Sequence, residues 1–367
     1  MGLLRSTLAS KPVASLTSPH TVDHYLEQVH PLWTVENVRA RVVSVERETG
    51  DASTVLLKPN RAWQGFRPGQ HVEFGVEVDG VRKVRVFSVS SSALRTDGLF
   101  SLSVKAHPDG FVSQFLHREL TPRTIVYLSQ AQGEFVLPDV LPERLALISG
   151  GSGITPVMSM LRTLADRAAS RAAHLGEVTF LHYARSRADE MFTDELDRLA
   201  GLAGVRLVRV YTRQPEAGAE LSGRFEHDHL RALGIDPGTT PAWVCGPAGL
   251  IASVRGVYAE QGTEHLLHQE YFKVPAVDLD AADATGTLSF DASATGAANS
   301  GATILEQAEA AGLTPEFGCR MGVCNTCAVK KLHGAVRHVI TGEVTANTDE
   351  TIKPCVNVPV GDVTVAL

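Results

Sequence analysis

The chain has 367 residues, of which 44% are hydrophobic and 20% charged, and this length is enough for two or three domains that each bury a core. A net charge of -7, from 41 acidic and 34 basic residues, argues against a nucleic-acid partner and allows docking to a basic protein. Only five cysteines occur, and no apolar stretch is long enough to span a bilayer. We therefore predict a cytoplasmic protein that has no disulfide scaffold and is not an integral membrane protein.

Residues 1–37 are expected to form a leader and an N-terminal extension. The first part of this segment has no acidic residue and is rich in Ser and Thr. That composition also fits a transit peptide, and the start at Gly2 matches a myristoylation pattern, but we favour a poorly ordered leader. Residues 24–38 predict a short helix and a turn that pack against the next domain.

Residues 38–142 predict a small antiparallel β-barrel. Short β-branched runs alternate there with turn residues such as Pro68-Gly69. Several short strands at this spacing are typical of a barrel. The expected strands are residues 42–45, 54–57, 71–76, 84–89, 99–104 and 124–128.

Residues 143–273 alternate strand-like and helical segments, which predicts a parallel α/β sheet. The strand at 145–148 leads into the glycine-rich run 150–156 and then a helix, which we expect Thr155 to cap and Pro156 to open. A glycine-rich turn of this kind lets backbone amides and the positive end of a helix meet a pyrophosphate, although an ordinary turn is the alternative. Further elements are expected as strands at 178–183, 205–211 and 242–245 and a helix at 189–199.

The residues after the second strand of such a sheet discriminate between NADH and NADPH. An acidic residue there binds a ribose hydroxyl, whereas arginine receives the extra phosphate of NADPH. This chain has Arg185 and Arg187 at that place, and Arg213 follows the third strand. These residues favour NADPH, while a solvated basic turn is the alternative and NADH stays open as the donor.

Two segments of the barrel carry groups that suit a cofactor. Strand alternation puts Arg85, Phe87 and Val89 on one face, where a cation and an aromatic plane can hold a phosphate and a flat ring. An ordinary strand is the alternative there. Residues 110–116 read as a turn that enters a helix and can offer amides to a second diphosphate.

The C-terminal part begins after an Asp- and Ala-rich linker at 274–285. Thr303 and Glu306 form a capping box that opens a helix ending at Gly312. Cysteines follow at the C-x4-C-x2-C…C spacing of a plant-type [2Fe-2S] cluster. The predicted ligands are Cys319, Cys324, Cys327 and Cys355.

Zinc bound by four thiolates is the alternative for these cysteines. It is less favoured because zinc usually takes two paired knuckles, and Cys355 has no second cysteine nearby. Gly322 and Asn325 also suit a loop whose amides turn inward toward sulfide. The 14 histidines are scattered, show no metal-binding spacing and are interpreted as structural.

Taken in order, these motifs resemble the ferredoxin-NADP reductase superfamily. They are R-x-F-S-x-x-S, G-x-V-S, G-G-x-G-x-x-P and C-G-P, followed by the cysteine run. The chain is similar to the reductases that carry a C-terminal plant-type ferredoxin domain and supply oxygenases and fatty-acid desaturases. The resemblance implies an FAD-binding β-barrel at 38–142, an NAD(P)-binding α/β domain at 143–273 and a β-grasp [2Fe-2S] domain at 286–367.

The resemblance also implies roles for residues of the barrel. Arg85 would hold an FAD phosphate, and Phe87, which replaces a more usual tyrosine, would lie against the isoalloxazine. Ser88 would form a hydrogen bond near the reactive flavin nitrogen, and Ser91 would be a further contact. The FAD diphosphate would meet Gly110 and Ser113.

Other implied contacts come from the α/β domain. The nicotinamide nucleotide would meet Gly151, Gly153 and Thr155. Cys245 of the C-G-P motif would lie close to the nicotinamide ring, with a small buried core thiol as the alternative. Glu270 and Phe272 would pass the far side of the flavin, with a plain strand end as the alternative.

The expected function is that of an oxidoreductase that moves electrons from NADPH through FAD to the [2Fe-2S] cluster. No side chain is required as a catalytic acid, base or nucleophile, because the cofactors carry the redox chemistry. The expected acceptor is a separate desaturase, hydroxylase or other oxygenase, which can be membrane-bound, and the reductase is expected to be a monomer. The alternatives are an NADH-dependent reductase for a Rieske aromatic-ring oxygenase or haem-thiolate monooxygenase, and a non-catalytic redox sensor.

Overall fold

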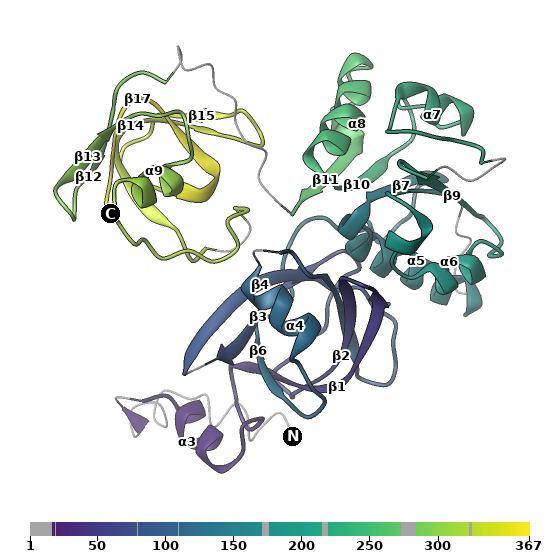
Figure 1. Ribbon diagram of the computed structural model, residues 1–367, viewed down its shortest axis with the longest axis horizontal. Helices are drawn as coiled ribbons and strands as arrows, with labels where there is room; N and C mark the ends of the chain where they lie inside the picture. The colour runs from purple at the N-terminus through teal and green to yellow at the C-terminus, as the bar shows by residue number, and fades with distance from the viewer. Residues whose placement is uncertain are drawn as a thin grey trace. The chain divides into compact units, whose positions relative to one another are not determined.

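The computed structural model describes residues 17–18, 20–78, 80–108, 110–170, 176–214, 219–272, 284–322 and 325–367. Most of the expected leader, most of the expected linker and Cys324 lie outside the described residues. The chain divides into two compact units, Met1–Glu270 and Tyr271–Leu367, each taken by itself below (Figure 1). Within the described residues, no helix is long and apolar enough to cross a membrane.

A short N-terminal helix, α3 (Val22–Val29), is fastened to the start of the barrel. The buried carboxylate of Asp23 accepts backbone N–H groups from Glu36 at 3.1 Å and Asn37 at 2.9 Å. Arg39 on the first barrel strand pairs with Glu27 of the helix at 2.6 Å. These contacts confirm the predicted short helix and turn, although the helix starts two residues earlier than expected.

The first sheet is antiparallel, and its strands confirm the predicted barrel runs. They are β1 (Val38–Thr49), β2 (Ala52–Pro59), β3 (His71–Val78), β4 (Val81–Ser88), β5 (Phe100–Lys105) and β6 (Ile125–Leu128). In the order β4-β3-β6-β1-β2-β5, the edge strands come together through a bridge between Val89 and Leu102, which closes the sheet. Helix α4 (Phe111–Arg118) contacts β2, β4 and β5, and the interior is filled by apolar side chains such as Phe74 and Phe100.

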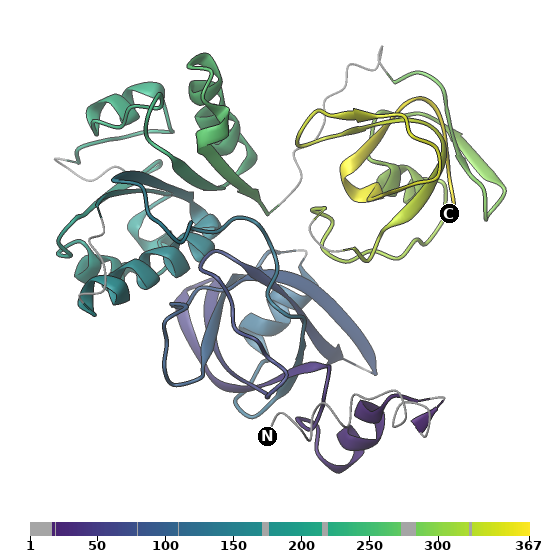
Figure 2. The same cartoon turned by 180° about the vertical axis from the view of Figure 1, so that it is seen from behind.

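The second sheet has the order β11-β10-β7-β8-β9, with β10, β7, β8 and β9 parallel, as the sequence predicted. Helices α5 and α6 lie on one face and α7 and α8 on the other (Figures 1 and 2). The strands are β7 (Arg144–Gly150), β8 (Glu177–Ala184), β9 (Val205–Tyr211), β10 (Ala242–Gly246) and β11 (Leu267–Tyr271). The helices are α5 (Ile154–Ala169), α6 (Thr193–Leu199), α7 (His227–Ala232) and α8 (Ala248–Glu260). The strand order reverses at β7, and in open α/β sheets the crevice at such a point receives the ligand.

Two local predictions in this sheet are wrong. Thr155 does not cap α5, because Gly151–Gly153 form a 3-10 turn that runs directly into a helix starting at Ile154. Pro156 therefore lies third in the helix, where its missing N–H is still harmless because the first-turn amides have no intrahelical acceptor. The helix expected at 189–199 begins only at Thr193, since Phe192 adopts a left-handed φ of 64° that interrupts it.

The second unit holds a mixed sheet crossed by one described helix, α9 (Ile304–Ala310). The strands are β12 (Thr287–Phe290), β13 (Thr295–Ala298), β14 (Val329–His338), β15 (Val344–Thr345), β16 (Glu350–Ile352) and β17 (Asn357–Val365). β12 and β17 are parallel, and the other pairs are antiparallel. The predicted capping box is confirmed, because the Thr303 hydroxyl accepts the Glu306 N–H and the Glu306 carboxylate accepts the Thr303 N–H. Gly312, with φ of 85°, follows the helix as expected.

Candidate cofactor sites

Ser88 and Glu270 come together where the barrel meets the α/β sheet. Ser88 ends β4, and Glu270 lies on β11, the last strand of the second sheet. His71 neighbours both residues, because it pairs with Ser88 across β3 and β4 and brings Nδ1 to 3.3 Å from Oε1 of Glu270. All three residues are buried, with exposed fractions of 4%, 9% and 5% in the order Ser88, Glu270, His71.

The pKa of the Glu270 carboxyl group depends on burial and on its two neighbours, His71 and Ser88. Burial raises its pKa, while the hydrogen bonds from His71 and Ser88 and the charge of His71 oppose that rise. Its Oε2 atom is buried and makes no hydrogen bond of normal geometry within the described residues. A buried carboxylate oxygen without such a bond is costly, so the site fits a bound group that offers a hydrogen-bond donor there.

Cys245 lies beside this carboxyl group, at the end of β10. Its side chain is fully buried, and both burial and the charge of Glu270 raise the pKa of the thiol. The thiol is therefore neutral at physiological pH and presents a small, polarisable group in place of a thiolate nucleophile.

The glycine-rich turn packs directly on the C-G-P segment. A Cβ on Gly153 would lie 2.2 Å from the carbonyl oxygen of Cys245, and one on Gly150 would lie 2.9 Å from Cδ of Pro247. Gly151 has φ of 54°, a conformation that favours glycine, and there is open space where its Cβ would stand. The Thr155 hydroxyl donates to the Ser152 carbonyl at 3.1 Å and stabilises the turn from within.

The two barrel residues expected at the ring and the phosphate lie side by side on β4. Phe87 packs edge-on against the core residue Phe74, with ring centroids 5.9 Å apart. Arg85 lies opposite Phe74 in the β3–β4 register, and one of its guanidinium nitrogens donates to the Val84 carbonyl at 2.7 Å. Both side chains are half-buried, which suits residues that border a bound group.

The turn before α4 is built around Ser113. Its hydroxyl donates to the Gly110 carbonyl at 2.9 Å and accepts the His107 N–H at 3.2 Å. A Cβ on Gly110 would lie only 2.4 Å from that hydroxyl, so a larger residue there would displace the Ser113 side chain. The predicted turn into a helix is confirmed, with Gly110 as the residue before the first helical position.

Ser91 links β5 to α5 through two hydrogen bonds. Its hydroxyl accepts the Ser101 N–H of β5 at 3.0 Å, and its carbonyl accepts the Ser159 hydroxyl of α5 at 2.8 Å. Ser91 is thereby placed on the contact between barrel and α/β sheet.

The three predicted arginines gather at the carboxyl ends of β8 and β9. Arg185 pairs with Asp189 at 2.7 Å and Arg187 pairs with Asp197 at 2.9 Å. The Arg213 N–H donates to the Arg185 carbonyl at 3.0 Å, which brings the third arginine beside the first. Each of the two paired guanidinium groups is about half exposed.

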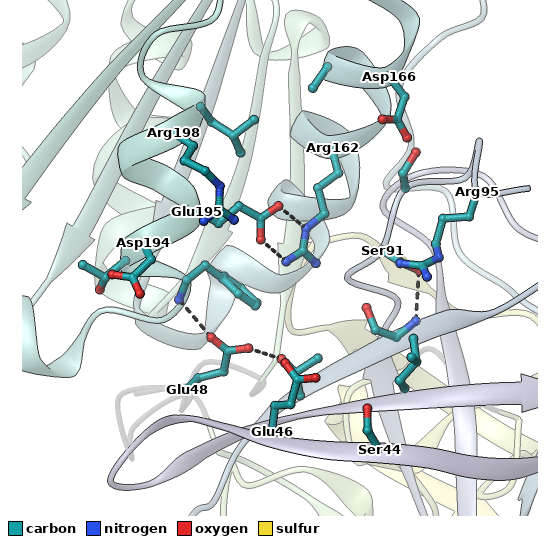
Figure 3. A pocket seen from close by; sticks show the side chains of 18 of the residues that line it. Ser44, Glu46, Glu48, Ser91, Arg95, Arg162, Asp166, Asp194, Glu195 and Arg198 are labelled. Carbon is teal, nitrogen blue, oxygen red and sulfur yellow. Dashed lines mark hydrogen bonds and ion pairs between the residues drawn. The ribbon is translucent and has the colours of Figure 1, made fainter. Parts of the chain in front are cut away.

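A cavity of about 770 Å³ lies elsewhere in the first unit, between the barrel and helices α5 and α6 (Figure 3). Arg162 spans it, donating to Glu195 at 2.8 Å and to the Ser90 carbonyl at 2.7 Å. Glu48 on β1 accepts the Phe192 N–H at 3.3 Å (Figure 3). Of the predicted cofactor residues only Ser91 lines this cavity, so it is a charged seam between the two sheets and not the predicted cofactor site.

Three of the four predicted cluster cysteines lie among the described residues, on one side of the second unit. The sulfurs of Cys327 and Cys355 are 3.4 Å apart, and the Met321 N–H points to the Cys319 sulfur at 3.3 Å. The hydrogen bond to Cys327 and burial raise the pKa of Cys355, with Cys319 contributing. Thiols gathered this closely suit an iron centre, because its positive charge stabilises thiolates that otherwise repel one another.

The cysteine loop is shaped by glycine and by a lysine. Gly322 has φ of 76°, and a Cβ there would lie 2.8 Å from a methyl group of Val356, so this position of the loop favours glycine. The Lys353 ammonium donates to the Gly322 carbonyl at 2.6 Å. Within the described residues alone, no three His, Cys, Asp or Glu side chains form a complete metal site, and Cys324 lies outside that part of the chain.

His71 is the site residue that sequence reasoning missed. The histidines were interpreted as structural because they show no metal-binding spacing. Local spacing cannot indicate that His71 contacts Glu270, which lies 199 residues further along the chain. The local signal for His71 was its position at the end of the turn Pro68-Gly69-Gln70-His71, where β3 begins. The other site residues were found because each belongs to a short motif.

The fold and these sites define a flavin- and pyridine-nucleotide-dependent oxidoreductase with an iron-sulfur domain. Three profiles match in order, the oxidoreductase FAD-binding domain at 39–137, the oxidoreductase NAD-binding domain at 147–256 and the 2Fe-2S iron-sulfur cluster binding domain at 291–358. The cofactors are therefore FAD, a pyridine nucleotide and a [2Fe-2S] cluster, and the zinc alternative is set aside. The chain belongs to the ferredoxin reductase family, in the branch that carries a C-terminal [2Fe-2S] domain.

Relatives support this placement along nearly the whole chain. An NADPH oxidoreductase of Mycobacterium tuberculosis is 36% identical over 356 residues, which is 96% of this chain and 90% of the relative. A glycine betaine monooxygenase reductase subunit of Chromohalobacter salexigens is 30% identical and covers 89% of this chain and 94% of its own length. The structure of a phthalate dioxygenase reductase shares the fold, with a TM-score of 0.58, 22% identity and coverage of 90% of this chain and 98% of that one.

Proposed function

We propose that this protein takes electrons from NADPH through FAD to its [2Fe-2S] cluster and delivers them to a separate oxygen-activating enzyme. The observation that carries the proposal is the meeting of Ser88, Cys245 and Glu270 beside the glycine-rich turn. When bound, the nicotinamide supplies two electrons as hydride, the flavin receives them, and the cluster takes one at a time. The domain bounds 38–142, 143–273 and 286–367, with a linker at 274–285, are part of the proposal, and the three profile matches fall inside them.

The barrel side chains are proposed to bind and orient FAD. Arg85 holds a phosphate, Phe87 borders the isoalloxazine, and Ser88 offers a hydrogen bond near the reactive nitrogen. Because the Ser113 hydroxyl already bonds within its own turn, backbone amides at the start of α4, after Gly110, contact the diphosphate. Ser91 supports this segment through its bonds to β5 and α5.

The residues of the α/β sheet are proposed to bind the nicotinamide nucleotide and keep water away from the ring. Gly151, Gly153 and Thr155 form the turn that receives it. The neutral thiol of Cys245 packs beside the nicotinamide. Glu270 on β11 and Phe272, which follows the end of that strand, border the flavin. A buried thiol and a carboxyl group with a raised pKa exclude bulk water without presenting a nucleophile.

NADPH is proposed as the donor because three arginines meet at the ends of β8 and β9. A phosphate on the nucleotide would replace Asp189 and Asp197 as the partner of Arg185 and Arg187. Arg213 adds a third positive charge beside them. The name of the Mycobacterium tuberculosis relative, an NADPH oxidoreductase, agrees with this choice.

The proposed acceptor is a fatty-acyl desaturase or a membrane hydroxylase, as the sequence resemblance suggested. The names of two matched proteins, a glycine betaine monooxygenase reductase subunit and a phthalate dioxygenase reductase, favour an oxygenase component as the second candidate. NADPH-driven oxygen uptake, reconstituted with each acceptor in turn, tests the choice. Coupled turnover with a desaturase supports the first candidate, and turnover only with an oxygenase component replaces it with the second.

A further inference from the structure

Resting on the proposed function, we propose that His71 is a positioning residue that holds the carboxyl group of Glu270 in place beside Ser88. His71 is itself firmly placed. Its backbone exchanges two hydrogen bonds with Gln132, at 3.0 and 2.9 Å, at the very start of β3. The same residue pairs with Ser88 on the other side, so its Cα has little freedom.

The imidazole ring of His71 occupies space that is left by the missing side chain of Gly133. Gly133 follows the Gln132 bridge and has φ of 108°. A Cβ on Gly133 would lie 2.8 Å from Cε1 and 2.9 Å from Nδ1 of His71. Only glycine leaves room for the ring at that place, and only glycine adopts that φ without strain. The edge of the ring that carries Cε1 and Nδ1 therefore packs against the backbone of Gly133.

The held nitrogen faces the carboxylate of Glu270. Nδ1 lies 3.3 Å from Oε1, and both side chains are at least nine-tenths buried. When the Glu270 carboxyl group is ionised, its oxygens can only accept, and Nδ1 then carries the hydrogen of this bond. The bond joins the barrel to the last strand of the α/β sheet and leaves Oε2 available to the bound cofactor.

The bond has an electrostatic consequence for the site. Burial raises the pKa of Glu270, and the hydrogen bond and charge of His71 oppose part of that rise. Among the described residues, the titratable groups that act on Glu270 or feel its charge are His71 from β3 and Cys245 from β10, and Ser88 from β4 adds a hydroxyl. Losing the His71 donor therefore both frees the carboxyl group and raises its pKa further.

Two amide substitutions separate this role from simple packing. The amide nitrogen of His71→Asn reaches about as far as Nδ1, whereas that of His71→Gln reaches about as far as Nε2 and misses Oε1. Each variant is loaded with FAD and followed by anaerobic stopped-flow reduction with NADPH, and the FAD midpoint potential is measured against pH. We expect about a tenfold slower reduction and an upward shift of the pH inflection for His71→Gln, and less than about a threefold change for His71→Asn.

Glu270→Gln is the reference that separates the possible failures. If it alters flavin reduction and the potential while His71→Gln behaves like the unsubstituted protein, the inference about His71 is overturned and the proposed function stands. If Glu270→Gln changes neither quantity although FAD binds, the flavin does not lie at this carboxyl group and the proposed site fails with it. Equal effects of His71→Asn and His71→Gln would also overturn the inference, because they would reflect ring packing alone.

Discussion

Gly153 and Cys245 are in backbone contact, so closely that a Cβ on the glycine would lie 2.2 Å from the cysteine carbonyl oxygen. The contact joins the turn after β7 to the end of β10, the point at which the strand order reverses. The clash could not be relieved cheaply, because the Cβ would be fixed to the buried Gly153 backbone and would meet the backbone carbonyl of the buried Cys245. The proposed nucleotide turn is therefore held in shape by the strand that carries Cys245.

Gly153→Ala is expected to deform this turn. The clash should lower the free energy of unfolding by about 1–3 kcal/mol and weaken NADPH binding, as measured by thermal unfolding and by nucleotide titration. Gly256→Ala is the matched control, since Gly256 lies on an exposed face of α8 with open space around it. That control should be neutral or stabilising by up to about 1 kcal/mol, and equal losses in both variants would contradict the account.

Arg185→Ala should discriminate between the two nicotinamide nucleotides. The KM for NADPH should rise about tenfold, because a charge-assisted hydrogen bond contributes about 1.5 kcal/mol or more, while kinetics with NADH stay nearly unchanged. Arg144→Ala removes a similarly exposed ion pair at the opposite end of the strands and serves as the control. Steady-state rates with a dye acceptor provide the measurement, and an equal loss with both nucleotides refutes the phosphate assignment.

Arg162→Met should loosen the contact between the barrel and the α/β sheet. Burial raises the pKa of Glu195, but the hydrogen bond and charge of Arg162 outweigh it, and the carboxyl pKa lies below its ordinary value. Because the pKa of Glu195 is lower in the folded state, its ionised carboxylate stabilises the fold at pH values above the unfolded-state pKa. This stabilisation is lost as the pH falls through the folded-state pKa. The variant should thus be less stable by about 2 kcal/mol at neutral pH, with the difference shrinking in acid.

Thermal or denaturant unfolding across pH measures this effect. Arg95→Ala is a suitable control because Arg95 lines the same cavity and pairs with the exposed Asp97. Its effect should stay below about 1 kcal/mol. A difference between Arg162→Met and the unsubstituted protein that grows on acidification would run against the sign derived from Glu195.

Cys355→Ser should remove the cluster and spare the flavin. Cys355 is a proposed ligand, and its sulfur lies 3.4 Å from that of Cys327 in the second unit. Cys245→Ser is the control, because Cys245 is a buried cysteine of the first unit. Iron and sulfide analysis should show a loss only in Cys355→Ser, and full iron content in that variant would exclude Cys355 as a ligand.

The order of elements could be predicted from the sequence because it depends on local patterns. The β-branched runs, the glycine-rich turn and the capping box at Thr303 each act over a few residues, and each was found in place. The start of α5 was misplaced because Thr155 and Pro156 carry cap signals that the preceding 3-10 turn overrides. The helix expected at 189–199 likewise starts late, because Phe192 adopts a left-handed φ that its helix propensity does not indicate.

The candidate site was predictable residue by residue but not as an arrangement. Ser88, Cys245 and Glu270 each belong to a motif, yet nothing in the sequence shows that the three meet. His71 has no motif at all, and its role depends on a strand far along the chain and on the space that Gly133 leaves. The pairing of Arg185 and Arg187 with carboxylates is equally a property of the folded chain.

The most direct test of the electron path is an anaerobic titration of the loaded protein with NADPH, followed by visible absorption and electron paramagnetic resonance. The account predicts that the flavin bands bleach rapidly and that a one-electron iron-sulfur signal then develops in the same sample. A flavin that stays oxidised, as expected of a redox sensor, or a cluster that stays silent after the flavin is reduced, would contradict it.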